Sequence, residues 1–521
     1  MSNAVLPKLS RKHLLQGLLG ITVAGALLSL CIFRTEPGEL VRSLGSLTVA
    51  ALIPALLCEA AVQLSKALKW QAVLSRVQPV RYTSTLAAVV VGAASTHLVP
   101  LRLDEVLRSA VLARREGLAP GTVLGTVPVE ADGSAYMELP ALRSFFFVAL
   151  DENDLSVKRM QSFLTLQPGE TTSCVGCHEQ RTHTPRLEYD LLALRRAPSS
   201  VEPVPDVPDV FDFPRDVQPI LDRHCVACHG SEATPQGGPL EGSIDLTGAR
   251  GPMYSHSYFA LTVNGQFSDG RNRPQSNYAP RTFGSSASPL MDKLGPEHYG
   301  VEVSDLERKI VRLWIEVGAP YPGTYAALGT GMIGGYERNQ IQRPDLDWPE
   351  TRAAQDVLDR RCASCHTDHL VLPRSPSDNR SMPPWDIRYG DIRLRLSRHI
   401  LYDLTRPERS MLVRAPLAPE AGGYGRCRAD FEDPGSALAT VFDSRDDPDY
   451  RTLLAAVEAA ARYLDEVKRF DMPGFQPRDA YLREMKRYGV LPADLEPSTP
   501  VDPYVTDRAY WRSLWFRPEE R

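Results

Sequence analysis

Three short segments combine cysteine and histidine at a spacing that suits one kind of chemistry. Each reads Cys-x-x-Cys-His, and the three hold Cys174, Cys177 and His178, then Cys225, Cys228 and His229, and finally Cys362, Cys365 and His366. Two thiols three positions apart can bond to the two vinyl groups of one haem, and the next imidazole can bind the iron. The motifs therefore predict three covalently bound haem c groups. Zinc or disulfide use of the cysteines would leave each following histidine unexplained.

The second axial ligand of an electron-transfer haem is commonly a histidine or methionine far along the chain. For the second haem we favour His298, which precedes a helical pattern, over His256. For the third haem His399 is preferred, with Met382 as its rival. The first haem has no well-placed candidate, which leaves two alternatives, an open iron or ligation by another chain or an unassigned residue.

The second and third motifs belong to an internal repeat that indicates how they are positioned. Residues 218–225 align with residues 355–362 without a gap, and this pattern predicts a helix that delivers each motif. Helical patterns at 304–317 and 450–467 then close each repeat, as in cytochrome c. The first motif differs, because it follows the turn at 166–170 and is expected on a loop.

Ahead of the motifs the sequence is strongly apolar. Residues 14–33, 44–64 and 84–100 predict three transmembrane helices. Haem c is attached outside the cytoplasm, so we expect an inner-membrane protein whose C-terminal haem domains lie in the periplasm or otherwise outside the cytoplasm. The net charge of −5 over 521 residues, without a long basic run, gives no sign of a nucleic-acid partner.

The expected fold class is mixed: N-terminal transmembrane helices, a small β-rich partial sandwich, and mainly α cytochrome c-like domains. The predicted boundaries are 1–122 for the membrane domain, 123–200 for a β-rich middle domain with the first motif, and 201–330 and 331–521 for the cytochrome c-like domains with the second and third. Strand-like sequence at 135–139 and 144–150 is too little for a whole sandwich. Either a partner chain completes it, or the chain joins parts of two proteins.

From about residue 125 to the C-terminus, the sequence resembles hydrazine synthase alpha-subunit-like proteins. The segments that carry the likeness are 125–136, 166–170 with 173–178, 217–225 and 314–321. The resemblance implies a β-rich middle domain with the first haem, followed by cytochrome-like domains. In that family a tyrosine near the first motif takes the iron, whereas here no tyrosine lies within ten residues after His178. Hydrazine formation is therefore not expected.

The N-terminal part is similar to the membrane domain of lysylphosphatidylglycerol synthase or flippase-like proteins, through Lys69-Trp70 and the segment 100–108. Taken together, the sequence predicts a membrane-anchored extracytoplasmic triheme cytochrome that passes electrons to redox partner proteins, with the lipid bilayer as a further partner. The alternative is a haem-dependent oxidoreductase that acts on a small nitrogen or oxygen compound at an open first haem.

Overall fold

The computed structural model describes residues 123–513, apart from 176–189, 233, 236–243, 271–277, 329–343, 368–369, 379–393, 395, 426, 429–434 and 497–498. The chain divides into two compact units, Met1–Glu116 and Gly117–Arg521, and every described residue belongs to the second. The predicted membrane domain at 1–122 thus lies outside the described residues.

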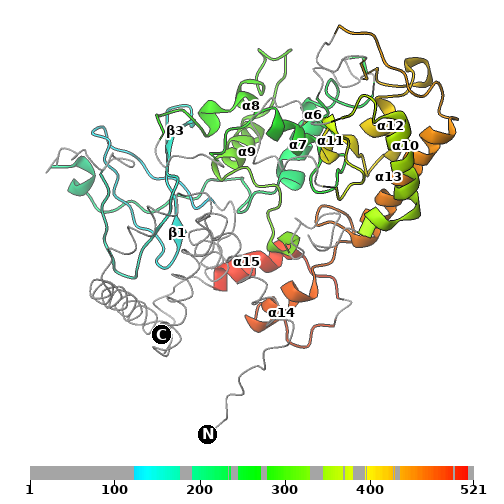
Figure 1. Ribbon diagram of the computed structural model, residues 1–521. Helices are drawn as coiled ribbons and strands as arrows, with labels where there is room; N and C mark the ends of the chain where they lie inside the picture. Colours follow the sequence, from blue (N-terminus) through cyan, green and yellow to red (C-terminus); the bar gives the residue numbers. More distant parts are fainter. Residues whose placement is uncertain are drawn as a thin grey trace, which may run out of the picture. The chain divides into compact units, whose positions relative to one another are not determined.

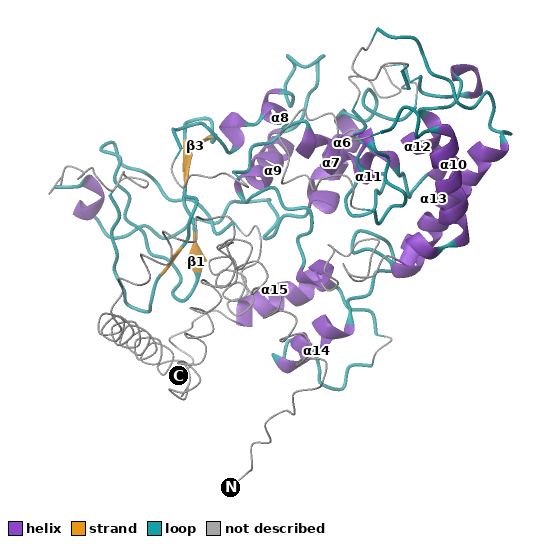
Figure 2. Ribbon diagram, in the orientation of Figure 1, coloured by secondary structure: helices purple, strands orange, loops and turns teal. Residues whose placement is uncertain are grey.

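The predicted fold class is wrong in its transmembrane part. Among the described residues, no helix has both the length and the apolar character needed to cross a membrane. What the structure contains there is a pair of two-stranded sheets followed by many helices, most of them short (Figures 1 and 2). The β-rich part is also smaller than a partial sandwich, because its strands span only two to four residues.

The two strands of one sheet lie between the two strands of the other in the sequence. Strand β1 (Ser144–Phe145) pairs antiparallel with β4 (Leu164–Thr165), and β2 (Val148–Leu150) pairs antiparallel with β3 (Ser156–Arg159). The strand predicted at 144–150 is therefore real but broken, and the one predicted at 135–139 is reduced to a single bridge. Several large apolar side chains of this region are exposed: Val129, Leu142, Phe146, Phe147, Phe163 and Val175.

The part around the second motif is helical. It contains α6 (Gln218–His224), α7 (His256–Val263), α8 (Pro289–Asp292) and α9 (Asp305–Glu316). Helix α9 begins at the Ser304 N-cap, whose side chain and that of Glu307 each accept a backbone N–H of the other residue, which satisfies donors that a helix start leaves unpaired. This confirms the helix predicted at 304–317.

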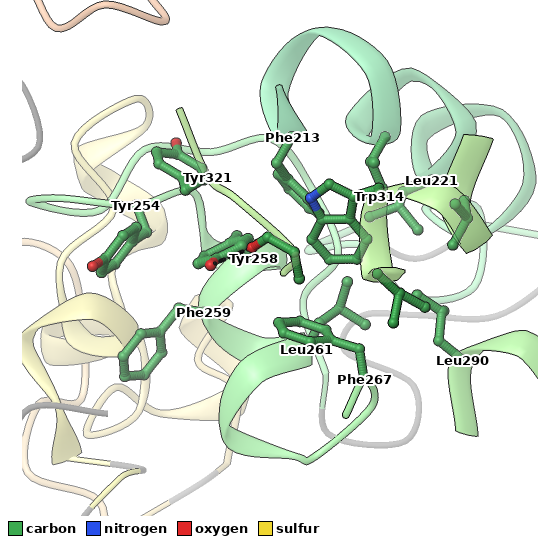
Figure 3. Close-up of a cluster of buried hydrophobic side chains, with 14 of the residues drawn as sticks. Phe213, Leu221, Tyr254, Tyr258, Phe259, Leu261, Phe267, Leu290, Trp314 and Tyr321 are labelled. Atoms are coloured by element: carbon green, nitrogen blue, oxygen red, sulfur yellow. Dashed lines mark hydrogen bonds between the residues drawn. The ribbon is translucent and has the colours of Figure 1, made fainter. Parts of the chain in front are cut away.

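An aromatic core holds these helices together (Figure 3). Trp314 of α9 is fully buried, and its ring centre lies 5.3 Å from Phe213 and 4.9 Å from Phe267. Tyr258 of α7 packs 5.1 Å from Phe213. Aromatic pairs at these distances add to the stabilisation from burial alone, so the core fixes α9 against α7 and against the turn that leads into α6.

The part around the third motif repeats the plan with a longer closing helix. Helix α10 (Pro349–Arg361) precedes the motif, and α13 (Pro448–Val467) packs along it. The predicted helix at 450–467 is confirmed, and it starts two residues earlier because Asp447 caps it. The remaining helices are α11 (Arg398–Leu401), α12 (Met411–Arg414), α14 (Asp479–Arg487) and α15 (Pro503–Ser513). Short helical turns occur at Leu192–Arg195, Phe213–Val217, Ser285–Ala287, Tyr325–Leu328, Pro344–Asp347, Pro407–Arg409 and Pro419–Ala421.

Polar contacts join the two haem-motif regions directly. The Arg469 side chain, fully buried, donates to the backbone oxygen of Gly251 over 2.8 Å and to both carboxylate oxygens of Asp471 over 2.6 and 2.8 Å. The Tyr321 hydroxyl donates to the same carboxylate over 2.9 Å. Residues 469–471, which follow α13, are thus bound into the core around α7 and α9.

Candidate haem-binding sites

In both repeats the helix before the motif continues through it as one further turn. The Cys225 N–H donates to Leu221 O over 2.8 Å, and the His229 N–H donates to Cys225 O over 2.8 Å. The equivalent bonds, from Cys362 to Leu358 O and from His366 to Cys362 O, are both 2.9 Å. Residues three and four positions apart share one face of a helical turn. The two thiols and the imidazole of each motif are therefore presented on the same side.

The structure brings His229 and His298 together. Their rings are parallel to within 5°, with centres 6.2 Å apart. Two imidazoles that bind one metal ion from opposite sides, each by a bond of about 2 Å and with about 1.1 Å from nitrogen to ring centre, would have centres about 6 Å apart. This spacing is compatible with two ligands of one metal ion, and the choice of His298 over His256 stays a prediction.

His298 is held in a tight turn between α8 and α9. Its N–H donates to Gly295 O over 3.0 Å, and its carbonyl accepts the N–H of Val301 over 3.1 Å. Burial lowers the pKa of His298, and the neighbouring His229 and Lys293 lower it further. A lowered pKa keeps the imidazole neutral at physiological pH, which is the state that binds a metal.

His366 of the third motif is oriented by a backbone carbonyl. Its Nδ1 lies 3.0 Å from Leu370 O, so Nδ1 carries the proton and Nε2 keeps a free lone pair for a metal. The ring borders a shallow hollow that opens to solvent. Its lining residues are Gln355, Leu358, Asp359, Cys362, Ala363, His366, Val371, Leu372 and Arg374. The donor set and the open space fit a haem attached at Cys362 and Cys365.

His256, the rival to His298, has both ring nitrogens engaged. Its Nε2 lies 3.1 Å from Tyr402 O, and its Nδ1 lies 3.7 Å from a carboxylate oxygen of Asp245. Because a carbonyl can only accept, Nε2 must carry a proton and cannot also bind a metal. The structure thus places His256 in a contact between the second and third motif regions.

His399, preferred for the third haem, is buried against the second-motif region. Its ring centre lies 4.8 Å from Phe259 and 5.5 Å from Tyr254, and its Nδ1 has no hydrogen-bond partner. Burial holds the pKa of His399 well below its usual range, with Arg398 and Arg469 nearby adding to the effect. The axial role of His399 stays a prediction, and its rival Met382 lies outside the described residues.

The first motif is described only in part. Cys174 is exposed at the end of a loop, as the sequence predicts, while Cys177 and His178 lie outside the described residues. Among the described cysteines of the three motifs, none is joined in a disulfide. Within the described ranges no group of three or more His, Cys, Asp or Glu side chains is arranged to hold a metal ion, so the zinc alternative gains no support there.

Sequence reasoning missed several residues around the motifs. Cys427, unassigned from sequence, lies near the third motif, and burial together with the Cys365 thiol raises its pKa to about 11. Glu307 and Asp449, at the starts of α9 and α13, bind the residues just ahead of Cys225 and Cys362. Glu307 had a local signal in the Ser304-x-x-Glu307 capping pattern, but nothing local to Cys427 or Asp449 points to these contacts.

A comparison with protein families matches residues 108–179 to the hydrazine synthase alpha subunit middle domain. This stretch includes the four strands and the cysteines and histidine of the first motif, so it is related to that domain over a limited part of the chain. No curated protein and no solved structure matches the chain. Nothing in these comparisons supports the resemblance of the N-terminal part to flippase-like membrane domains.

Proposed function

We propose that this chain is a hydrazine synthase alpha-like c-type cytochrome that transfers electrons outside the cytoplasm, where haem c is attached. The observation that carries the proposal is the parallel pair His229 and His298, 6.2 Å apart between ring centres, beside Cys225 and Cys228. A haem held by these two cysteines would give both imidazoles a shared iron to bind. The third motif repeats the same turn and adds a tautomer fixed by Leu370 O.

Each residue of the second site has a defined task. Cys225 and Cys228 would hold the haem through thioether bonds, and His229 and His298 would be the protein ligands of its iron. The haem, when bound, supplies an iron that changes oxidation state by one electron. An iron held by two protein ligands would leave no position for a substrate, which suits electron transfer to and from redox partner proteins rather than catalysis.

A second function is favoured by a different observation, the family match that covers the first motif. The haem attached at Cys174 and Cys177 would then act on a small nitrogen or oxygen compound, and the other two haems would carry electrons to or from it. The exposure of Cys174 suits access by a small substrate. This activity requires a first haem with an open axial position.

The first test is to make the protein with a c-haem maturation system and to count covalent haems by the pyridine haemochrome assay. We expect three haems per chain. Variants then test the axial pair, because carbon monoxide binds a reduced haem only where an axial position is free. His298→Ala should create one new carbon monoxide-binding haem, whereas His256→Gln should create none.

Fewer than two covalent haems per chain would contradict the proposal. A wild-type protein that binds carbon monoxide at one haem would favour the oxidoreductase alternative. If His256→Gln rather than His298→Ala opened the second haem, the assignment of the axial pair would be wrong.

A further inference from the structure

The two cytochrome-like repeats share a contact between distant residues. In each, the two residues just ahead of the first cysteine are basic: Arg223 and His224 precede Cys225, and Arg360 and Arg361 precede Cys362. In each, a carboxylate in the first turn of the closing helix binds both of them. The two partners are 84 residues apart in one repeat and 89 in the other. Each contact is therefore formed by the fold and not between neighbours in the sequence.

In the second-motif region the carboxylate belongs to Glu307. One of its oxygens accepts from Arg223 Nη2 over 2.6 Å and lies 3.2 Å from His224 Nε2. Its other oxygen accepts the Ser304 N–H over 2.8 Å. One side chain therefore binds the start of α9 and the end of α6 at once, and these bonds outweigh the burial that acts against ionisation, so that the pKa of Glu307 falls to about 2.

In the third-motif region the carboxylate belongs to Asp449. Its two oxygens accept from Arg360 Nη2 over 2.7 Å and from Arg361 Nη1 over 3.3 Å. Asp449 is the second residue of α13, whereas Glu307 is the third residue of α9. Aspartate is shorter than glutamate, but Arg361 is longer than His224, which takes the same place in the other repeat. The two combinations therefore make the same connection between the motif helix and the closing helix.

Helix α9 also holds the turn that carries His298. Arg308, the neighbour of Glu307, donates from Nη1 to Met291 O over 3.1 Å and to Leu294 O over 3.4 Å, just ahead of that turn. Two adjacent residues of α9 thus hold the approach to both axial histidines. Glu307 holds α6, which leads to His229, and Arg308 holds the segment that leads to His298.

We propose that Glu307 and Asp449 are positioning residues, each a latch that fixes its haem-attachment turn against the closing helix and thereby sets the axial geometry of its own haem. The inference rests on the proposed function. Arg223 and Arg360 are each more than half exposed, and ion pairs with such side chains add little to stability. Because such ion pairs occur beside both motifs, we explain them by the positioning of the motif turn rather than by a contribution to stability.

The first motif provides a contrast. Thr172 and Ser173 precede Cys174, and neither can form an ion pair with a carboxylate. The latch is thus a property of the two repeated cytochrome units and not of every haem motif in the chain.

The test uses the fully loaded protein and four single variants. Glu307→Gln and Asp449→Asn remove the charge with little change of shape, and glutamine still suits the capping position of α9. Glu302→Gln and Asp443→Asn are the matched controls, because both carboxylates are exposed and the structure gives neither a side-chain contact. Haem count and circular dichroism come first, to establish that each variant is loaded and folded.

The informative readouts are electron paramagnetic resonance of the oxidised protein and redox titration of each haem. Parallel imidazole planes give a rhombic low-spin signal, and rotation of one ring changes it. We expect Glu307→Gln to shift the signal and the reduction potential of the second haem alone. Asp449→Asn should shift only those of the third haem, and both controls should match wild type.

Arg223→Gln removes the ion-pair partner of Glu307 and should reproduce the effect of Glu307→Gln. This second variant keeps the test valid if one variant does not fold. Unchanged signals and potentials in the folded, loaded latch variants would overturn the inference. A wild-type protein without covalent haem would instead defeat the proposed function, so the two failures are distinguishable.

Discussion

At the scale of single residues, His256 shows how a buried histidine can serve structure rather than ligation. It lies between Asp245 and Tyr402 O, in a contact that joins segments 146 residues apart. Burial acts to lower its pKa, but the bonds to Asp245 and Tyr402 and the charge of Asp403 outweigh it, and the pKa is raised. Folding therefore favours the charged form of His256 relative to the unfolded chain.

The raised pKa predicts how stability varies with pH. A histidine ionises near pH 6.5 in the unfolded chain, so its contribution is fully present below about pH 6.5 and is lost as pH rises through the higher folded pKa. We expect this contribution, measured by denaturant titration as the difference in the free energy of unfolding between wild type and His256→Gln, to decrease as pH rises through this window. His256→Gln should remove that slope and cost about 1–3 kcal/mol at pH 6 through unpaired buried groups.

The matched comparison is Asp245→Asn, which should weaken the slope in the same direction because it removes the largest favourable partner of His256. A slope that is unchanged in both variants would show that other groups set the pH dependence.

At the scale of elements, α9 is the helix on which most of the second site depends. Its buried face holds Trp314, whose Nε1 donates to Pro320 O over 2.8 Å while the ring packs on Phe213 and Phe267. Its first turn holds Glu307 and Arg308. The helix therefore connects the aromatic core to the segments that carry His229 and His298.

Replacing the Trp314 side chain by a small one should destabilise the folded protein. We expect Trp314→Ala to lower the free energy of unfolding by about 3–5 kcal/mol, the range seen for large aromatic side chains removed from cores. Leu306→Ala, at an exposed position in the first turn of the same helix, should stay within about 0.5 kcal/mol of wild type. Denaturant unfolding followed by tryptophan-independent circular dichroism would measure both. Equal effects of the two substitutions would contradict the burial described for α9.

Elements with strong local signals could be predicted from the sequence. The helical pattern at 304–317 predicted the helix that the structure contains, and the repeat of 218–225 with 355–362 predicted both motif helices. The predictions of strands at 135–139 and 144–150 were less accurate. Where a strand is interrupted depends on the segments it pairs with, and these lie elsewhere in the sequence. Residues 146–147 lie between two different sheets.

Only part of the candidate site could be predicted. Spacing predicted that the cysteines and histidine of each motif lie together, and the second and third motifs do form such a turn, while the preference for His298 over His256 stays a prediction. The place of His399 depends on packing against Phe259, which is 140 positions away in the sequence, and no local pattern reports such a contact. The latch residues were missed for the same reason, since their partners are brought close only by the fold.

At the scale of the whole described part, the buried Arg469 is the strongest link between the two haem-motif regions. Its partner is Asp471. Burial disfavours the charged form of the Asp471 carboxylate, but Arg469 outweighs this effect and holds the pKa of Asp471 below its usual value. Tyr321 and Gly251 of the other region complete the network. Breaking such a pair leaves an uncompensated buried charge.

Arg469→Met should therefore destabilise the protein by about 3–5 kcal/mol and reduce its cooperativity. Scanning calorimetry should show the single transition of wild type replaced by two, as the regions around α9 and α13 unfold separately. Arg462→Met, an exposed arginine on α13, is the control and should leave one transition. A single, unshifted transition in Arg469→Met would show that the network does not couple the two regions.

The same network has a consequence for the order of biogenesis. Gly251 O and the Tyr321 hydroxyl meet their partners only when residues 469–471 are present, and a chain is made from its N-terminus. The core around Trp314 is thus incomplete until both cysteine pairs, at 225–228 and 362–365, have been synthesised. If haem is attached as proposed, attachment at both motifs can precede closure of the core, and the thiols would then be reached before the fold is finished.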